Sequence, residues 1–414
     1  MKTVEIMDTT LRDGEQTSGV AFSAQEKLDI ARLLLNKLHV NRIEIASARV
    51  SDGEFEAVTK ICEWAERHNY IDKIEVLGFL DGTTSLEWLQ RTGCKTINLL
   101  TKGSMNHLTN QLRKTPEQHI NDIKQLLTDA KERNITVNIY LEDWSNGMLH
   151  SPDYVYQLLD RLKDTRISRF MLPDTLGVLN PFQVYDFFTE IIARYPDLHF
   201  DFHAHNDYDL ATANVLAAVK AGVHGVHTTI NGLGERAGNA PLSSVLAMLH
   251  DQLQVKTSID EKNLYPASRV VETYSGVRVS SNCPVIGDHV FTQCAGIHAD
   301  GDKKNNLYYN DLLPERFGRT REYALGKTSG KANIAKNLEQ LGITLDNDMM
   351  QKLTAHVVEL GDKKELVTPE DLPYIIADIQ NLSDHDAIKI TNFTLSSAYE
   401  MRPVASFKVE INDE

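Results

Sequence analysis

The sequence predicts a (β/α)8 TIM barrel, and three observations support this fold class. Short apolar, β-branched segments alternate with amphipathic ones, as parallel strands alternate with crossover helices. The alternation recurs about eight times over roughly 255 residues, which is the size of a barrel domain. No G-x-G-x-x-G follows the first strand, and this absence disfavours the runner-up, a doubly wound open sheet.

The predicted strands are short runs rich in Ile, Val, Leu and Phe. In chain order they span residues 4–10, 42–47, 73–79, 96–102, 136–143, 169–175, 199–205 and 225–232. Helix starts follow several of them. Ser23 and Glu26 have the spacing of a capping box, and Pro152 and Pro181 are expected at the first helical position. Pro241 is expected to open the helix after the eighth strand in the same way.

The barrel is expected over residues 1–258. After it, the regular alternation of strand and helix segments ends. Residues 259–330 contain an ordered loop region rich in Gly, Asn, Lys and aromatic residues, and residues 331–386 are predicted to be mostly helical. The chain ends, over 387–414, in two segments of strand periodicity. Two strands cannot bury a face alone, so they either join another element or begin a further domain.

Composition narrows the function classes. The 414 residues carry a formal net charge of −15, which disfavours nucleic acid or an anionic membrane as the main partner. The four cysteines form no C-x-x-C pair, so neither a disulfide framework nor a thiolate zinc site is indicated. No signal-peptide run or membrane-spanning segment is evident, and the cytoplasm is the expected location.

Two histidines at the end of the seventh strand indicate a metal site. His203 and His205 are two residues apart on a strand, so both point to the same side. Catalytic residues of this fold lie at the carboxyl ends of the strands. Two imidazoles opposite a carboxylate suit Zn, Mn, Fe or Co.

The third ligand should be acidic. Asp13, after the first strand, is well placed because the first and seventh strands are separated only by the eighth. Asp8 and Glu15 are rival carboxylates at this point, and Asn239 could add a neutral oxygen.

Other polar residues gather at the same rim. Arg12 could bind an anionic substrate or stabilise charge on a carbonyl oxygen, and Thr175 offers a hydroxyl for a carboxylate. Further along, His298 beside Asp300 is a candidate base with its orienting partner, and Tyr308 a candidate proton donor. A basic cluster suggests a phosphate-bearing cosubstrate such as coenzyme A, and comprises Lys303, Lys304, Arg316, Arg319, Arg321 and Lys327.

Three ordered motifs, at residues 8–16, 203–205 and 232–239, carry a family resemblance over nearly the whole chain. They read DTTLRDGEQ, HAH and GLGERAGN. The chain resembles the metal-dependent Claisen-condensing acyltransferases, which include the 2-isopropylmalate, citramalate and homocitrate synthases. This resemblance implies one divalent metal ion (Zn, Mn, Co or Mg), acetyl-CoA as cosubstrate, a 2-oxo acid as acceptor, and a role in branched-chain amino acid (isoleucine or leucine) biosynthesis.

The resemblance also implies roles for particular residues. Asp13, His203 and His205 would bind the metal, and Arg12 and Thr175 would hold the 2-oxo acid. The acid–base apparatus near the acetyl group would comprise Glu142, His298 and Tyr308, with Asp300 in support. In this family a partner chain completes the site, so we expect a homodimer in which the His298 region acts in trans.

The acyl pocket decides the acceptor. Leu77, Leu100 and Tyr140 are expected beside the acyl group, and their bulk resembles citramalate synthase, in which such a wall fits only the methyl of pyruvate. Isopropylmalate synthases commonly place His where Asn98 stands, and homocitrate synthases usually place Glu where Asp13 stands. The expected reaction is therefore condensation of acetyl-CoA with pyruvate to (R)-citramalate. 2-Isopropylmalate synthase is the alternative, and homocitrate synthase is less favoured.

Two other function classes stay open. Hydroxymethylglutaryl-CoA lyases resemble this chain around the H-x-H motif but carry Gly-Gly-Cys-Pro after the eighth strand, where this chain has residues 232–239, so a metal-dependent aldolase or lyase is less favoured. A non-catalytic metal or acyl-CoA binder is the third hypothesis.

Residues 387–414 resemble only the beginning of the regulatory domain that ends long family members, and residues 259–330 resemble the linker subdomain that completes the active site.

Overall fold

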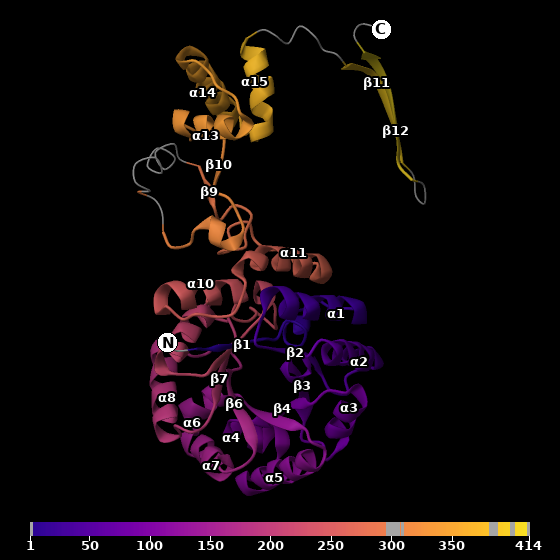
Figure 1. Cartoon of the computed structure of the whole chain (residues 1–414), viewed down its shortest axis with the longest axis vertical. Coiled ribbons are helices and arrows are strands. Elements are labelled where there is room, and N and C mark those ends of the chain that lie inside the picture. The colour runs from indigo at the N-terminus through magenta and orange to yellow at the C-terminus, as the bar shows by residue number, and fades with distance from the viewer. Residues whose placement is uncertain (1–2, 295–306, 308–309, 381–387, 398–401, 412–414) are drawn as a thin grey trace. The chain divides into compact units, whose positions relative to one another are not determined.

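The computed structural model describes residues 3–294, 307, 310–380, 388–397 and 402–411. Parallel strands close into a barrel in chain order, and the first strand pairs with both the second and the eighth (Figure 1). The prediction of a (β/α)8 barrel is confirmed. The strands are β1 (Glu5–Asp8), β2 (Arg42–Ser47), β3 (Ile74–Phe79), β4 (Thr96–Lys102), β5 (Thr136–Glu142), β6 (Ile167–Asp174), β7 (Phe200–Ala204) and β8 (Gly225–Thr228).

Helices surround the barrel (Figure 1). Ser23 and Glu26 form the predicted capping box, and Pro152 and Pro181 each begin a helix. Pro241 instead precedes its helix by one residue, because a bridge to Thr229 holds it in extended conformation. The helices are α1 (Ala24–Arg32), continuing as η2 (Leu33–Leu38), α2 (Asp52–Arg67), α3 (Thr84–Thr92), α4 (Met105–His107), α5 (Pro116–Glu132), α6 (Trp144–His150), α7 (Pro152–Leu162), α8 (Pro181–Arg194), α9 (Ala211–Ala221) and α10 (Leu242–Leu253).

Charged side chains fill the amino-terminal end of the barrel interior. Arg42 donates to Glu5 at 3.1 Å, to Glu75 at 2.8 Å and to Asp201 at 2.5 Å, and so ties four strands together. The Arg42 side chain is only 5% exposed. Buried charges are tolerated where they are paired and hydrogen-bonded in this way.

An apolar cluster lies in the barrel interior as well. It consists of Met7, Leu77, Tyr140 and Met171, with Leu100 packed against it. These residues come from β1, β3, β5, β6 and β4, which shows that their side chains point inward from around the barrel wall.

The chain continues after α10 into helices and short strands. The helices expected within residues 259–386 are present, and α13, α14 and α15 share a core that includes Ile334, Leu353 and Leu372. The elements are η6 (Glu261–Asn263), α11 (Leu264–Ser275), β9 (Thr292–Gln293), η7 (Pro314–Phe317), β10 (Glu322–Tyr323), α13 (Lys331–Leu341), α14 (Asn347–Asp362), η8 (Pro369–Asp371), α15 (Leu372–Ile379), β11 (Ile388–Ser396) and β12 (Val404–Ile411).

The chain divides into two compact units. One comprises Met1–Val290 with Asp311–Arg319, and the other comprises Phe291–Asn310 with Thr320–Glu414. The four-part domain division made from the sequence stays a prediction. Among the residues that the structure describes, no helix is long and apolar enough to cross a membrane.

The two terminal strands form an antiparallel hairpin, with apolar cross-strand pairs such as Phe393 opposite Phe407 and Leu395 opposite Ala405. The two strands agree with the strand periodicity predicted for residues 387–414.

Candidate functional site

The loop after β1 presents Arg12 and Asp13 to the barrel mouth. Its turn is closed by hydrogen bonds from the amides of Arg12 and Gly14 to the carbonyl of Thr9, both 3.1 Å long. Beneath it, the fully buried ammonium of Lys27 donates to the carbonyl of Leu11 at 3.2 Å. The chain conformation that places Arg12 and Asp13 is therefore held from inside.

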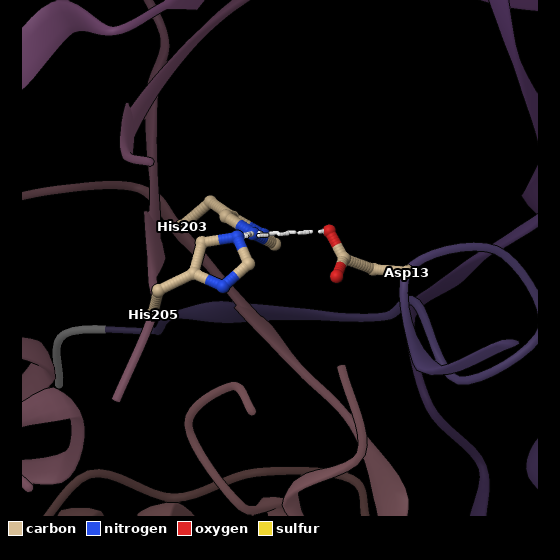
Figure 2. A group of neighbouring side chains, drawn as sticks. All are labelled: Asp13, His203 and His205. Carbon is tan, nitrogen blue, oxygen red and sulfur yellow. Dashed lines mark hydrogen bonds and ion pairs between the residues drawn. The ribbon is translucent and has the colours of Figure 1, made fainter. Parts of the chain in front are cut away.

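The structure brings Asp13, His203 and His205 together (Figure 2). Asp13 Oδ2 lies 3.4 Å from His203 Nε2 and 3.9 Å from His205 Nε2, and the two Nε2 atoms are 3.3 Å apart. All three residues are buried. One ligand atom from each points to a common centre, as in a site for a single ion.

The chemistry of these donors fits a divalent metal. Burial opposes the charge of Asp13, but Arg12 and the two imidazoles hold the pKa of its carboxyl well below the usual value. Burial, with repulsion from His203, lowers the pKa of His205 to about 4. A carboxylate and neutral imidazoles are the protonation states that bind metal.

Asn239 completes the surroundings of this centre. Its Nδ2 donates to Asp13 Oδ1 at 2.9 Å and to the carbonyl of Leu233 at 2.9 Å. Within the described residues its buried Oδ1 has no hydrogen-bond partner. Asn239 thus orients the carboxylate directly and keeps one oxygen available.

The rival carboxylates are engaged elsewhere. Asp8 is buried and accepts from the amide of Thr10 at 2.9 Å. Glu15 forms an ion pair with Lys27 at 2.6 Å and accepts from the amide of Phe22. Of the three acids weighed from the sequence, Asp13 is the one that faces the two histidines.

Arg12 lies between two carboxylates. Its Nη1 is 2.9 Å from Asp13 Oδ2 and its Nε donates to Glu44 Oε2 at 2.6 Å. Burial disfavours the charge, but the attractions of Glu44, Asp13 and Tyr140 together raise the pKa of Arg12 above its ordinary value. The guanidinium is a permanent cation beside the three converging ligand atoms.

Thr175 stands at the end of β6 with its hydroxyl oriented by the backbone. Its Oγ1 accepts from the amide of Asp143 at 2.9 Å, which leaves the hydroxyl hydrogen free to be donated to another group. Arg236 binds Asp207 through two hydrogen bonds and donates to the Thr175 carbonyl at 2.7 Å. This clamp joins the loops that follow β6, β7 and β8.

Glu142 ends β5 and pairs with Lys102 across the register of β4 and β5. Its side chain is 24% exposed, so the carboxylate stays accessible at the rim. Lys102 is in turn fixed through its backbone: its amide donates to His119 and its carbonyl accepts from Tyr154.

The predicted acyl wall also comes together. Leu77, Leu100 and Tyr140 belong to one interior cluster. The Tyr140 ring lies edge-on to His203, with centroids 6.3 Å apart, and the Arg12 guanidinium carbon is 5.8 Å from its centroid. The cluster therefore borders the candidate metal centre.

His298, Asp300, Tyr308, Lys303 and Lys304 lie outside the described residues. Two members of the predicted basic cluster have partners within the chain. Arg316 pairs with Glu261 and Asp251, and Arg319 donates to the carbonyls of Gly287 and Asp288. These contacts do not favour phosphate binding by the two arginines.

Several contacts among buried polar residues near Arg12 and Tyr140 were not predicted from the sequence. Glu44 accepts from Arg12 and from Asn98 Nδ2, and Asn98 Oδ1 accepts from Asn138. His227 lies between Tyr140 and Asp201. The sequence shows Glu44 flanked by two isoleucines within the strand Arg42–Ser47, which marks it as a carboxylate inside the sheet but does not identify its partners.

Comparisons with known proteins agree with this geometry. Residues 3–271 match the HMGL-like family, and residues 285–365 match the homocitrate synthase post-HMGL domain-like family. The (R)-citramalate synthase of Methanocaldococcus jannaschii is 33% identical over 411 residues, covering 99% of this chain and 82% of the relative. The 2-isopropylmalate synthase of Saccharolobus solfataricus is 34% identical over 382 residues, covering 92% and 97%.

A solved structure of HMG-CoA lyase from Bacillus subtilis has the same barrel. It superposes with a TM-score of 0.58 at 23% identity, over 67% of this chain and 96% of that one. The site geometry, the family matches and the full-length relatives together place the chain in the HMGL-like family, among the acyl-transferring citramalate and 2-isopropylmalate synthases.

Proposed function

We propose that the protein condenses acetyl-CoA with pyruvate and water to give (R)-citramalate and free coenzyme A. The observation that carries this choice is the bulky wall of Leu77, Leu100 and Tyr140 beside Arg12 and His203. A wall at this place leaves room for a methyl group and opposes the isopropyl group of 2-oxoisovalerate.

Asp13, His203, His205 and Asn239 would hold one divalent ion, for which Zn, Mn, Co and Mg are the candidates. When bound, the ion supplies Lewis acidity toward the 2-oxo acid. Arg12 holds its positive charge where negative charge develops on the acceptor's oxo oxygen. The Thr175 hydroxyl is oriented to donate to the substrate carboxylate.

The acetyl group needs a base that removes a methyl proton. We assign this work to Glu142 together with His298, Asp300 and Tyr308, and the latter three would come from the second chain of a homodimer. The acetyl-CoA enolate attacks the oxo carbon; the π bond of the oxo group opens as the new C–C bond forms, and its oxygen takes up a proton to become the hydroxyl of the product. Water then cleaves the thioester and releases coenzyme A. We expect this enzyme in the cytoplasm.

2-Isopropylmalate synthesis is the second candidate, and the Saccharolobus solfataricus relative supports it. Discrimination by one or two methylenes is worth only about 1–3 kcal/mol, so the wall has to be rigid to exclude the larger acid. Homocitrate synthesis is less favoured because Asp stands at position 13. A lyase direction is less favoured because residues 232–239 lack the Gly-Gly-Cys-Pro loop.

The test is release of free coenzyme A from acetyl-CoA with a panel of 2-oxo acids, in metal-loaded protein. We expect the highest kcat/KM with pyruvate and no activity in the His203→Ala variant. A preference for 2-oxoisovalerate contradicts the choice of pyruvate. The synthase proposal would be overturned if the protein rapidly cleaved a hydroxyacyl-CoA analogue of the product and released no free thiol from acetyl-CoA with any 2-oxo acid. An unchanged metal content in His203→Ala would show that the ion does not bind at Asp13, His203 and His205.

A further inference from the structure

His227 is a buried histidine in the barrel interior that the proposed chemistry does not use. It is 1% exposed and lies between two other buried groups. Its Nδ1 is 3.2 Å from the hydroxyl of Tyr140, and its Nε2 is 3.3 Å from Asp201 Oδ2. The three side chains form one chain of hydrogen bonds across β5, β8 and β7.

The direction of these hydrogen bonds follows from the Asp201 end. Arg42 Nη2 approaches the Asp201 carboxylate at 2.5 Å, and His199 Nε2 lies 2.9 Å from its other oxygen. An ionised carboxylate only accepts, so His227 Nε2 carries the proton. Nδ1 of the neutral ring is then an acceptor, and the Tyr140 hydroxyl donates to it.

Packing fixes Asp201 in this position. A Cβ on Gly225, its register neighbour on β8, would lie 2.3 Å from Asp201 Oδ1. The strand therefore leaves room for the carboxylate by having no side chain there, and the carboxylate cannot move without losing Arg42.

Tyr140 has a second acceptor within reach. Glu44 Oε2 lies 3.4 Å from the hydroxyl, but the same oxygen accepts from Arg12 Nε at 2.6 Å. A hydroxyl that turned toward Glu44 would compete with Arg12. The bond to His227 keeps the hydroxyl away from that pair and holds the ring in the acyl cluster.

We propose that His227, held by Asp201, is a positioning residue that fixes the Tyr140 ring and thereby sets the largest 2-oxo acid that the pocket accepts. This inference rests on the proposed function, and it names the hydrogen bond that makes the wall rigid. His227 acts through Tyr140 and does not touch the substrate.

The experiment measures kcat/KM for pyruvate, 2-oxobutyrate and 2-oxoisovalerate in the metal-loaded full chain. The variants are Tyr140→Phe, His227→Leu, His227→Asn, and the double variant Tyr140→Phe/His227→Leu. His227→Asn keeps an acceptor near the place of Nδ1, whereas His227→Leu removes it. Val226→Ala is the matched control, because Val226 is the fully buried neighbour on β8 whose side chain points to the opposite face.

We expect His227→Leu and Tyr140→Phe each to lower the pyruvate to 2-oxoisovalerate preference by about tenfold, with KM for pyruvate rising more than kcat falls. The double variant should match either single variant, since both remove one contact. His227→Asn should keep most of the preference, and Val226→Ala all of it. If His227→Leu does not fold, the test is the contrast between Tyr140→Phe, which should lose the preference, and His227→Asn, which should keep most of it; an unchanged preference in Tyr140→Phe then overturns the inference.

Two results overturn the inference: an unchanged preference in both Tyr140→Phe and folded His227→Leu, or fully additive effects in the double variant. Nitrogen NMR of the His227 ring tests the hydrogen bond to Tyr140 without any turnover. It therefore distinguishes a failure of the inference about His227 from a failure of the proposed function. Loss of the hydroxyl in Tyr140→Phe should shift the Nδ1 resonance and leave Nε2 nearly unchanged. An unmoved Nδ1 resonance also refutes the contact, whatever the enzyme condenses.

Discussion

Leu99 and Leu100 are consecutive residues of β4 whose side chains point to opposite faces. Leu100 packs against the interior cluster, and Leu99 is fully buried outside it. Leu100→Ala should therefore relax selectivity toward larger 2-oxo acids by about tenfold, since the volume removed borders the acyl site. Kinetics with pyruvate and 2-oxoisovalerate check this. Leu99→Val is the control and should leave the ratio unchanged; an equal response of both variants would mean that the pocket lies elsewhere.

A second residue-scale prediction concerns Asp8. Burial raises the pKa of its carboxyl from 3.8 to about 7, despite hydrogen bonds from Thr10 that lower it. The unfolded chain ionises this group first, so the native state loses stability as pH rises from about 4 to 7, by up to about 4 kcal/mol. Asp8→Asn should be more stable than wild type at pH 8, and equally stable near pH 4.

Denaturant unfolding of the metal-free protein at several pH values measures this difference. Asp164→Asn makes the same chemical change at an exposed position between α7 and β6 and serves as the control. If Asp8→Asn lowers stability at pH 8, the Asp8 carboxyl is ionised and paired in the native state.

At the scale of elements, Lys27 on α1 supports the loop that follows β1. Its buried ammonium binds Glu15 and Glu54, as well as the carbonyl of Leu11. Lys27→Met leaves two carboxylates uncompensated, which should cost about 3–5 kcal/mol of unfolding free energy. It should also weaken metal binding by about 10–100-fold, because Asp13 loses its supporting loop.

Unfolding and metal titration test these two effects separately. Lys60→Met removes an exposed ion pair with Glu56 on α2 and should change stability by less than about 0.5 kcal/mol. Adding Glu15→Gln and Glu54→Gln to Lys27→Met should restore part of the stability. Normal metal affinity in Lys27→Met would show that the loop holds Asp13 without it.

The sequence pattern was informative for elements and for strand ends, and much less so for the barrel interior. Periodicity located β1 to β8, and the fold rule then placed Asp13, His203 and His205 at one rim. Pro241 was misplaced by one residue because a tertiary bridge to Thr229 outweighs the helix-start signal. Contacts such as Glu44 with Arg12 or His227 with Tyr140 depend on register and on which face points inward, and local sequence specifies neither.

At the scale of the whole molecule, the candidate metal centre ties the first strand to the seventh. Asp13 comes from the loop after β1, and His203 and His205 come from the end of β7. A ligand that binds only the native state stabilises it by about 2.7 kcal/mol at a hundred times its Kd. The ion should therefore stabilise the barrel as a unit, beyond any effect on catalysis.

Chelation should accordingly lower the melting temperature of the wild-type protein, and adding back Zn, Mn, Co or Mg should restore it with a dependence on ion concentration. His203→Ala should melt at the same temperature with and without the chelator, because it lacks a ligand. His250→Ala, which changes an exposed histidine on α10, should respond as the wild type does. Equal sensitivity of His203→Ala and wild type would show that the stabilising ion binds at another place, and the role of Asp13, His203 and His205 would have to be abandoned.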